Sequence, residues 1–76
     1  MTQNDTHIET ASGQIRAYLA IRPHGVDTPE GVAQWWLGGS FPPDVVEAAL
    51  ERLLASGEME RVNMGQRQLW RGVRAV

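Results

Sequence analysis

The stretch TPEGVAQWWLGGSFPPDVVEAALERLLASG, residues 28–57, predicts two helices separated by a glycine-rich break. The first begins after Thr28, whose hydroxyl suits an N-cap, and Pro29 takes the first helical position, where its missing N–H costs nothing. Two glycines and a serine at 38–40 end this short helix. A longer helix follows the proline pair, which only a first helical turn tolerates, and we expect Gly57 to be its left-handed C-cap.

The longer helix is amphipathic. Its core face, flanked by Val45 and Leu54, is formed by Val46, Ala49, Leu50 and Leu53. Its opposite face holds Asp44, Glu47, Ala48, Glu51 and Ala55. The helix dipole explains an acid near the N-terminus without any ligand, and Arg52, the helix's one basic residue, projects to the side. One face therefore suits a core, and the other is acidic.

A further helix is predicted before this stretch and a hairpin after it. Thr6 and Glu9 match a capping box, so the first helix is expected to start near Thr6. It ends before Pro23, because the residue that precedes a proline avoids the α region, and a short extended link follows at 24–27. The hairpin strands are expected at 59–63 and 66–71, around a short turn at Met64 and Gly65.

A chain of 76 residues forms one small domain, which we expect at 8–72 between flexible segments at 1–7 and 73–76. Because cysteine is absent, disulfides and Cys-ligated zinc are excluded. No apolar run approaches the roughly 18 residues that span a bilayer, and from the polar start MTQNDTHIET we expect no signal peptide. We therefore expect a cytoplasmic protein with no membrane partner.

The order of the predicted elements resembles that of a winged helix-turn-helix domain, of the small stand-alone bacterial type. The segments that carry the resemblance are residues 28–37, 46–57 and 57–71, which look like the second helix, the third helix and the wing. The resemblance implies an α+β fold, mainly α, with three helices and a C-terminal β-hairpin wing. It also implies a DNA-binding transcriptional regulator, whose third helix enters the major groove while the wing touches an adjacent groove or the phosphates.

The distribution of charge departs from that pattern. Residues 1–60 carry three arginines and nine acids, whereas residues 61–76 carry four arginines and no acid. Because DNA presents about one negative charge per 1.7 Å of its axis, an acidic third helix opposes binding. We therefore expect DNA contacts chiefly from the wing arginines: Arg61, Arg67, Arg71 and Arg74.

Two alternatives to a basic DNA-binding wing stay open. Strand alternation places Arg67, Leu69 and Arg71 on one face and Gln68 and Trp70 on the other, so the arginines need not form one patch, and some of them pair with the acidic body instead. Alternatively, the chain is a protein-interaction adaptor that binds no DNA. Its partner surface would comprise Trp35, Asp44, Glu47 and Glu51. Against this, a tiny domain uses large rings for its core, which favours a wide apolar face that covers both Trp35 and Trp36.

Catalytic and metal-binding signatures are missing from the sequence. His7 and His24 are seventeen positions apart, and neither has a second ligand at helical spacing. The glycine pair at 38–39 lies between helices and lacks the lysine of a phosphate-binding loop. We expect no enzyme activity, no metal and no cofactor, and a monomer or weak dimer.

Overall fold

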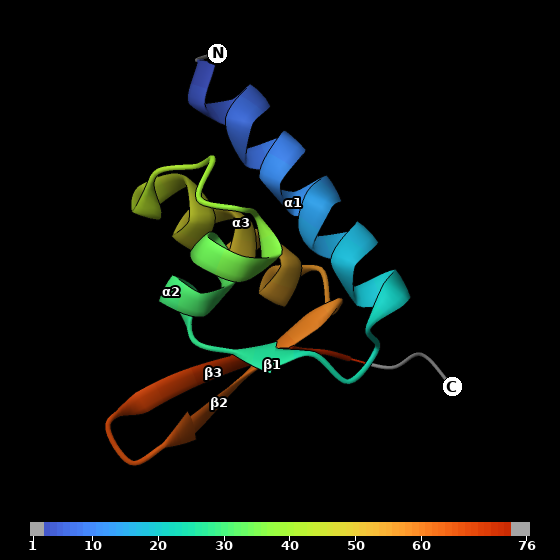
Figure 1. The fold of residues 1–76 in the computed structure, drawn as a ribbon, viewed down its shortest axis with the longest axis vertical. Coiled ribbons are helices and arrows are strands. Elements are labelled where there is room, and N and C mark those ends of the chain that lie inside the picture. The colour runs from blue at the N-terminus through green and yellow to red at the C-terminus, as the bar shows by residue number, and fades with distance from the viewer. Residues whose placement is uncertain (1–2, 74–76) are drawn as a thin grey trace.

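Three helical segments pack on one side of a three-stranded antiparallel sheet (Figure 1). The computed structural model describes residues 3–73. The helices are α1 (Gln3–Ile21), α2 (Pro29–Gly31), which continues into the π-helical turn η1 (Val32–Trp36), and α3 (Pro43–Ala55). The strands are β1 (Val26–Asp27), β2 (Met59–Met64) and β3 (Arg67–Gly72), in the order β1-β3-β2. The structure is therefore α+β and mainly helical, as the sequence predicts.

Helix α1 begins one turn earlier than the capping-box pattern predicts. Thr6 lies inside the helix, where its carbonyl accepts a 2.9 Å hydrogen bond from the hydroxyl of Thr10. Residues 3–7, which the sequence patterns leave in a flexible terminal segment, are thus helical. Nothing in Gln3, Asn4 or Asp5 breaks a helix, and adding a turn to an existing helix is favourable. The end at Ile21, ahead of Pro23, is confirmed.

The second helix starts as predicted but changes its pitch. The Thr28 hydroxyl accepts a 3.1 Å hydrogen bond from the N–H of Gly31, which confirms the N-cap. A Cβ on Gly31 would overlap the carboxylate of Asp27, which would have to move from the position in which it accepts a hydrogen bond from the N–H of Thr28. The N–H of Leu37 then bonds the carbonyl of Val32 at 3.0 Å, so the hydrogen bond spans five residues, as in a π-helix, and not the four of an α-helix.

Helix α3 follows the predicted bounds and buries the predicted face. Its core side chains are Val45, Val46, Ala49, Leu50 and Leu53. Gly57 has φ of +82°, and the N–H of Glu58 bonds the carbonyl of Leu53 at 2.9 Å, as in a Schellman motif. The predicted left-handed cap at Gly57 is confirmed, and it turns the chain directly into β2.

The hairpin turn lies one residue later than predicted. Met64 pairs with Arg67, and Gly65, with φ of +63°, and Gln66 form the two-residue turn. The extended link before Thr28 contributes the third strand, because Val26 pairs with Arg71 and Asp27 with Trp70. Two residues are too few to show an alternating pattern, so the sequence predicts no strand there.

The two faces of the sheet differ in what covers them. The inner face packs under the helices through Met59 and Trp70, both buried. The opposite face, here called the outer sheet face, consists of Val26, Glu60, Val62, Met64, Arg67, Leu69 and Arg71. In Figure 1 the described helices all lie above the sheet, so the outer sheet face is turned away from them.

Candidate interaction surfaces

The outward side of α3 presents the predicted acidic residues to solvent. Asp44, Glu47 and Glu51 are all exposed, and together they are called the acidic face below. Glu51 forms an ion pair with Arg61, in which Oε2 lies 3.2 Å from Nη1. Asp44 and Glu47 form no ion pair with any residue in 3–73. The acidic face therefore keeps most of its negative charge after folding.

Arg61 does not belong to a free basic wing. It lies opposite Trp70 in the sheet register, so its side chain is on the inner face, toward α3. Its guanidinium carbon is 5.5 Å from the centroid of the Trp70 ring and also reaches Glu51. Arg61 thus spans the hollow between α3 and the hairpin, which Glu47 and Gln68 also line. The indole N–H of Trp70 is buried there, and no atom of the described residues accepts a hydrogen bond from it.

The other wing arginines are also not gathered in one patch. Arg71 forms a 2.6 Å ion pair through Nε with Oε2 of Glu60, across the β2–β3 ladder on the outer sheet face. Arg67 shares that face, as alternation predicts, and makes no ion pair with any described residue. Arg74 lies outside the described residues. Of the four predicted arginines, Arg67 at the hairpin tip is therefore the described one that forms no ion pair within residues 3–73.

Trp35 is exposed, which corrects the expectation that the apolar face covers both rings. Its exposed fraction is 74%, whereas Trp36 is 8% exposed and stacks on Tyr18 with ring centroids 4.3 Å apart. Trp36 stacks on Tyr18 of α1, and Trp35, the preceding residue of the turn, points in a different direction. The sequence left this exposure open as the alternative.

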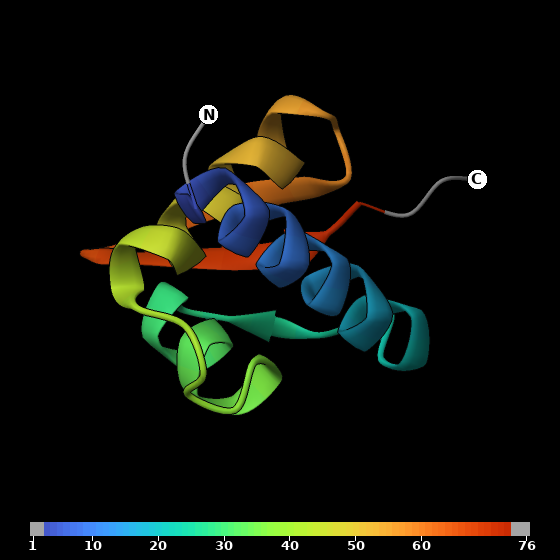
Figure 2. The ribbon, with the colours of Figure 1, turned by 90° about the horizontal axis from the view of Figure 1, so that it is seen from above.

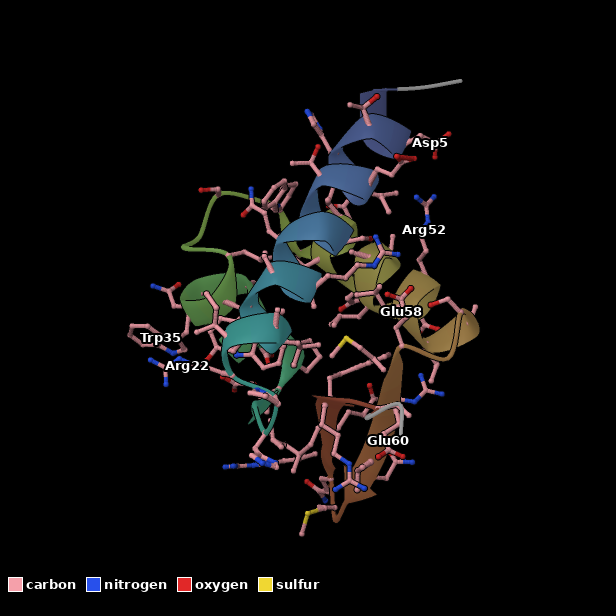
Figure 3. The ribbon with its side chains drawn as sticks, turned by 90° about the vertical axis from the view of Figure 1, so that its right-hand side faces the viewer. Asp5, Arg22, Trp35, Arg52, Glu58 and Glu60 are labelled. Atoms are coloured by element: carbon pink, nitrogen blue, oxygen red, sulfur yellow. The ribbon has the colours of Figure 1, made fainter. Side chains whose placement is uncertain are left out.

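Trp35 and the C-terminal half of α3 lie on different sides of the molecule. Figure 3 shows Trp35 projecting from one side of the molecule, near Arg22, while Arg52 of α3 projects from the other side. In the view from above, η1 and the C-terminal half of α3 likewise lie at opposite edges (Figure 2). Trp35 is therefore remote from the C-terminal half of α3.

One ion pair that sequence reasoning missed joins α1 to the start of β2. Arg16 binds Glu58 with two hydrogen bonds, Nε to Oε1 at 2.6 Å and Nη2 to Oε2 at 2.9 Å. The Ser56 hydroxyl donates to Oε2 at 2.7 Å. These donors, Arg16 first, lower the pKa of Glu58 from its ordinary 4.5 to about 2, and the same bond raises the pKa of Arg16. A separation of 42 residues gave no local signal for this pair.

Residues 3–73 hold no group of three or more His, Asp or Glu side chains arranged to bind a metal ion. Among the same residues no helix is long and apolar enough to cross a membrane.

We compared the chain with protein-family models, with curated proteins and with solved structures. None of these comparisons gives a match.

Proposed function

We propose that this chain is a winged-helix domain that binds a protein partner through α3, in place of the DNA that such a helix reads in the family it resembles. Its element order, the pairing of β1 with β3 and the C-terminal hairpin support this assignment of the fold. The segment of the partner that contacts α3 is basic, because it lies against the carboxylates of the acidic face.

The exposed acidic face carries the proposal. A helix that enters the major groove passes between two rows of phosphates. Most of its affinity comes from lysine and arginine side chains that neutralise these phosphates and release the counterions bound to the DNA. Asp44 and Glu47 bring to that position two carboxylates that form no ion pair with residues 3–73, and Glu51 adds a third that Arg61 offsets. The same charges attract lysine and arginine side chains, and complementary charge of this kind raises association rates and selects partners.

Trp35 supports protein binding by a second route. Exposed tryptophan is costly to leave in water and is among the residues most enriched at the centres of protein interfaces. Because Trp35 lies on the side of the molecule opposite Arg52, it would contact a different part of the partner from the C-terminal half of α3, or a different partner. Its exposure is measurable directly: the wild-type fluorescence should contain a red-shifted, readily quenched component that Trp35→Phe removes.

DNA binding through the wing is the second candidate, and Arg67 favours it. Arg67, which forms no ion pair with residues 3–73, lines a hollow at the hairpin tip together with the exposed side chains of Gln66 and Gln68. The ion pairs of Arg61 and Arg71 are worth only about 0–1 kcal/mol each because they are solvent-exposed, so phosphates compete for them. If the wing binds DNA, Arg67→Ala should weaken binding to every sequence and reduce the salt slope by about 1.

The test of the proposal is a titration of isotope-labelled protein with an arginine-rich peptide at physiological salt, followed by amide chemical shifts. We expect the shifts to concentrate on α3 and to vanish in the double variant Asp44→Asn, Glu47→Gln. The matched control is Glu30→Gln, which removes an exposed acid from α2 and should leave the peptide response unchanged. Equal binding by the double variant and the control would overturn the proposal.

A further inference from the structure

We infer that the outer sheet face is the contact surface of a weak, symmetric dimer of this chain. Exposed large apolar side chains among the described residues are Ile21, Val26, Trp35, Met64 and Val73. Two of these, Val26 and Met64, belong to the outer sheet face, with exposed fractions of 48% and 60%. Val62 and Leu69 lie between them, half-buried, and no helix in 3–73 covers the group (Figure 1).

The cross-strand register orders the face into three rows. At the root, Arg71 lies between Val26 and Glu60 and forms its ion pair with Glu60. The middle row is apolar and joins Leu69 to Val62. The tip row joins Arg67 to Met64. In each row, the residue of β3 thus lies beside a residue of β2 that either carries the opposite charge or is apolar.

This pattern is complementary to itself. A two-fold axis that runs along the hairpin between β2 and β3 places each strand over the other strand of a second copy. Glu60 then faces Arg71 of the other copy, and Leu69 faces Val62, on both sides of the axis. Such isologous contact is the commonest way in which soluble proteins associate, because one complementary pair of patches is used twice.

The charges on the outer sheet face favour a second copy of this chain over an unrelated partner. The root row carries one acid and one base, so it is neutral as a whole, and an acidic or a basic partner would leave one of them opposed by like charge. In the dimer the four root charges alternate in sign. The stem of Arg67 covers the exposed Met64 of the other copy, while its guanidinium stays at the solvent edge.

The face is small, which sets the strength of the dimer. Seven side chains are well below the roughly 20–30 residues per side of a standard stable interface. We therefore expect a monomer at low concentration and a dimer as the concentration rises. This association does not use the acidic face or Trp35, so it stands or falls independently of the proposed partner binding.

Sedimentation equilibrium of the whole chain over a wide concentration range tests the inference. Wild type should fit a monomer–dimer equilibrium, and Leu69→Lys should weaken it by about tenfold or more, since an apolar side chain is replaced by a charge at the centre. Ile21→Lys is the matched control, because Ile21 is an exposed apolar residue of α1 outside the face, and it should leave the equilibrium unchanged. A wild type that stays monomeric throughout, or equal effects of the two variants, overturns the inference.

Exchanging the charges of Glu60 and Arg71 distinguishes the loss of a dimer contact from the unfolding of a variant. Glu60→Arg should weaken the dimer, because it sets like charges opposite each other within and between copies. Adding Arg71→Glu restores opposite charges in the row, so the double variant should dimerise again. No recovery in a double variant that retains the wild-type circular dichroism spectrum contradicts the proposed arrangement.

The direction of the two copies is tested with a spin label. The chain has no cysteine, so Gln66→Cys in the turn gives one attachment site outside the face. In a mixture of spin-labelled chains and isotope-labelled chains, the label should broaden the amide of Arg67, at the tip of the other copy. Broadening at Glu60 and Arg71 in place of the tip would mean that the copies run in opposite directions, which contradicts the axis proposed.

Discussion

Helix α3 and the C-terminal hairpin carry opposite charges in the sequence, but folding treats those charges differently. The three carboxylates of α3 remain exposed, and one of them, that of Glu51, forms an ion pair. In the hairpin, Arg61 turns inward to Glu51 and Trp70, and Arg71 is bound by Glu60. The acidic helix therefore stays acidic, whereas the basic hairpin is largely neutralised. A charge count along the chain locates charged segments, but strand alternation and register decide which charges reach the surface.

The two faces of α3 should give the largest contrast in stability. Leu50 is fully buried, so Leu50→Ala should lower the free energy of unfolding by about 2–5 kcal/mol through lost burial and a cavity. Glu47→Ala, one turn away on the acidic face, should change it by no more than about 0.5 kcal/mol. Urea denaturation of both variants measures the difference. Similar losses would mean that Glu47 has a structural role that the fold does not show.

The hairpin turn should be sensitive through its backbone alone. Gly65 has φ of +63°, and a Cβ added there would meet no heavy atom within 4 Å, so Gly65→Ala meets no clash. The substitution should still cost about 1–2 kcal/mol, because a left-handed backbone disfavours any side chain. Gly13 is the matched control, since it is exposed in α1 with an equally open surrounding. Gly13→Ala should stabilise the folded protein by up to about 1 kcal/mol. Thermal denaturation of the two variants shows whether each substitution raises or lowers the stability.

Removing the contact between hairpin and helix should have a smaller effect on stability and a clear effect on binding. Arg61→Ala deletes the ion pair to Glu51 and the cation over Trp70, which together contribute about 0.5–1.5 kcal/mol. It also frees Glu51, so the arginine-rich peptide should bind more tightly to α3. Isothermal calorimetry measures that change. Weaker peptide binding would show that Arg61 itself contacts the partner.

The smallest expected effect is the acid dependence of the Arg16–Glu58 pair. Because folding lowers the pKa of Glu58 from 4.5 to about 2, its contribution to stability is fully present above pH 4.5 and is lost as the pH falls toward 2. Both side chains are about half exposed, so the contribution stays below about 1 kcal/mol. Glu58→Gln should flatten that part of the stability profile. Arg52→Gln, which leaves the pair intact, should follow the wild-type profile.

Sequence patterns predicted the elements whose signals are local. The bounds of α3, its buried face and its glycine cap follow from apolar spacing and from one residue with a required conformation. The Thr28 cap was predicted for the same reason. The hairpin was found from its change of period, with an error of one residue at the turn.

Features that depend on tertiary contact were not predictable in the same way. Trp35 is exposed because Trp36 takes the stacking position on Tyr18, a choice made by the relative position of two helices. The partners of Arg61 and Arg16 come from elements distant in the chain. Strand β1 exists because β3 offers it an edge, and its two residues carry no pattern of their own.

The most direct test of the contrast between α3 and the hairpin is a titration with a mixed-sequence DNA duplex, followed by amide shifts at low and at physiological salt. We predict that the α3 amides do not shift at either salt concentration. Any response should be confined to the hairpin tip around Arg67 at low salt and should disappear at physiological salt. Shifts along the acidic face of α3 that persist at physiological salt would contradict the account, because the helix would then bind DNA despite its charge.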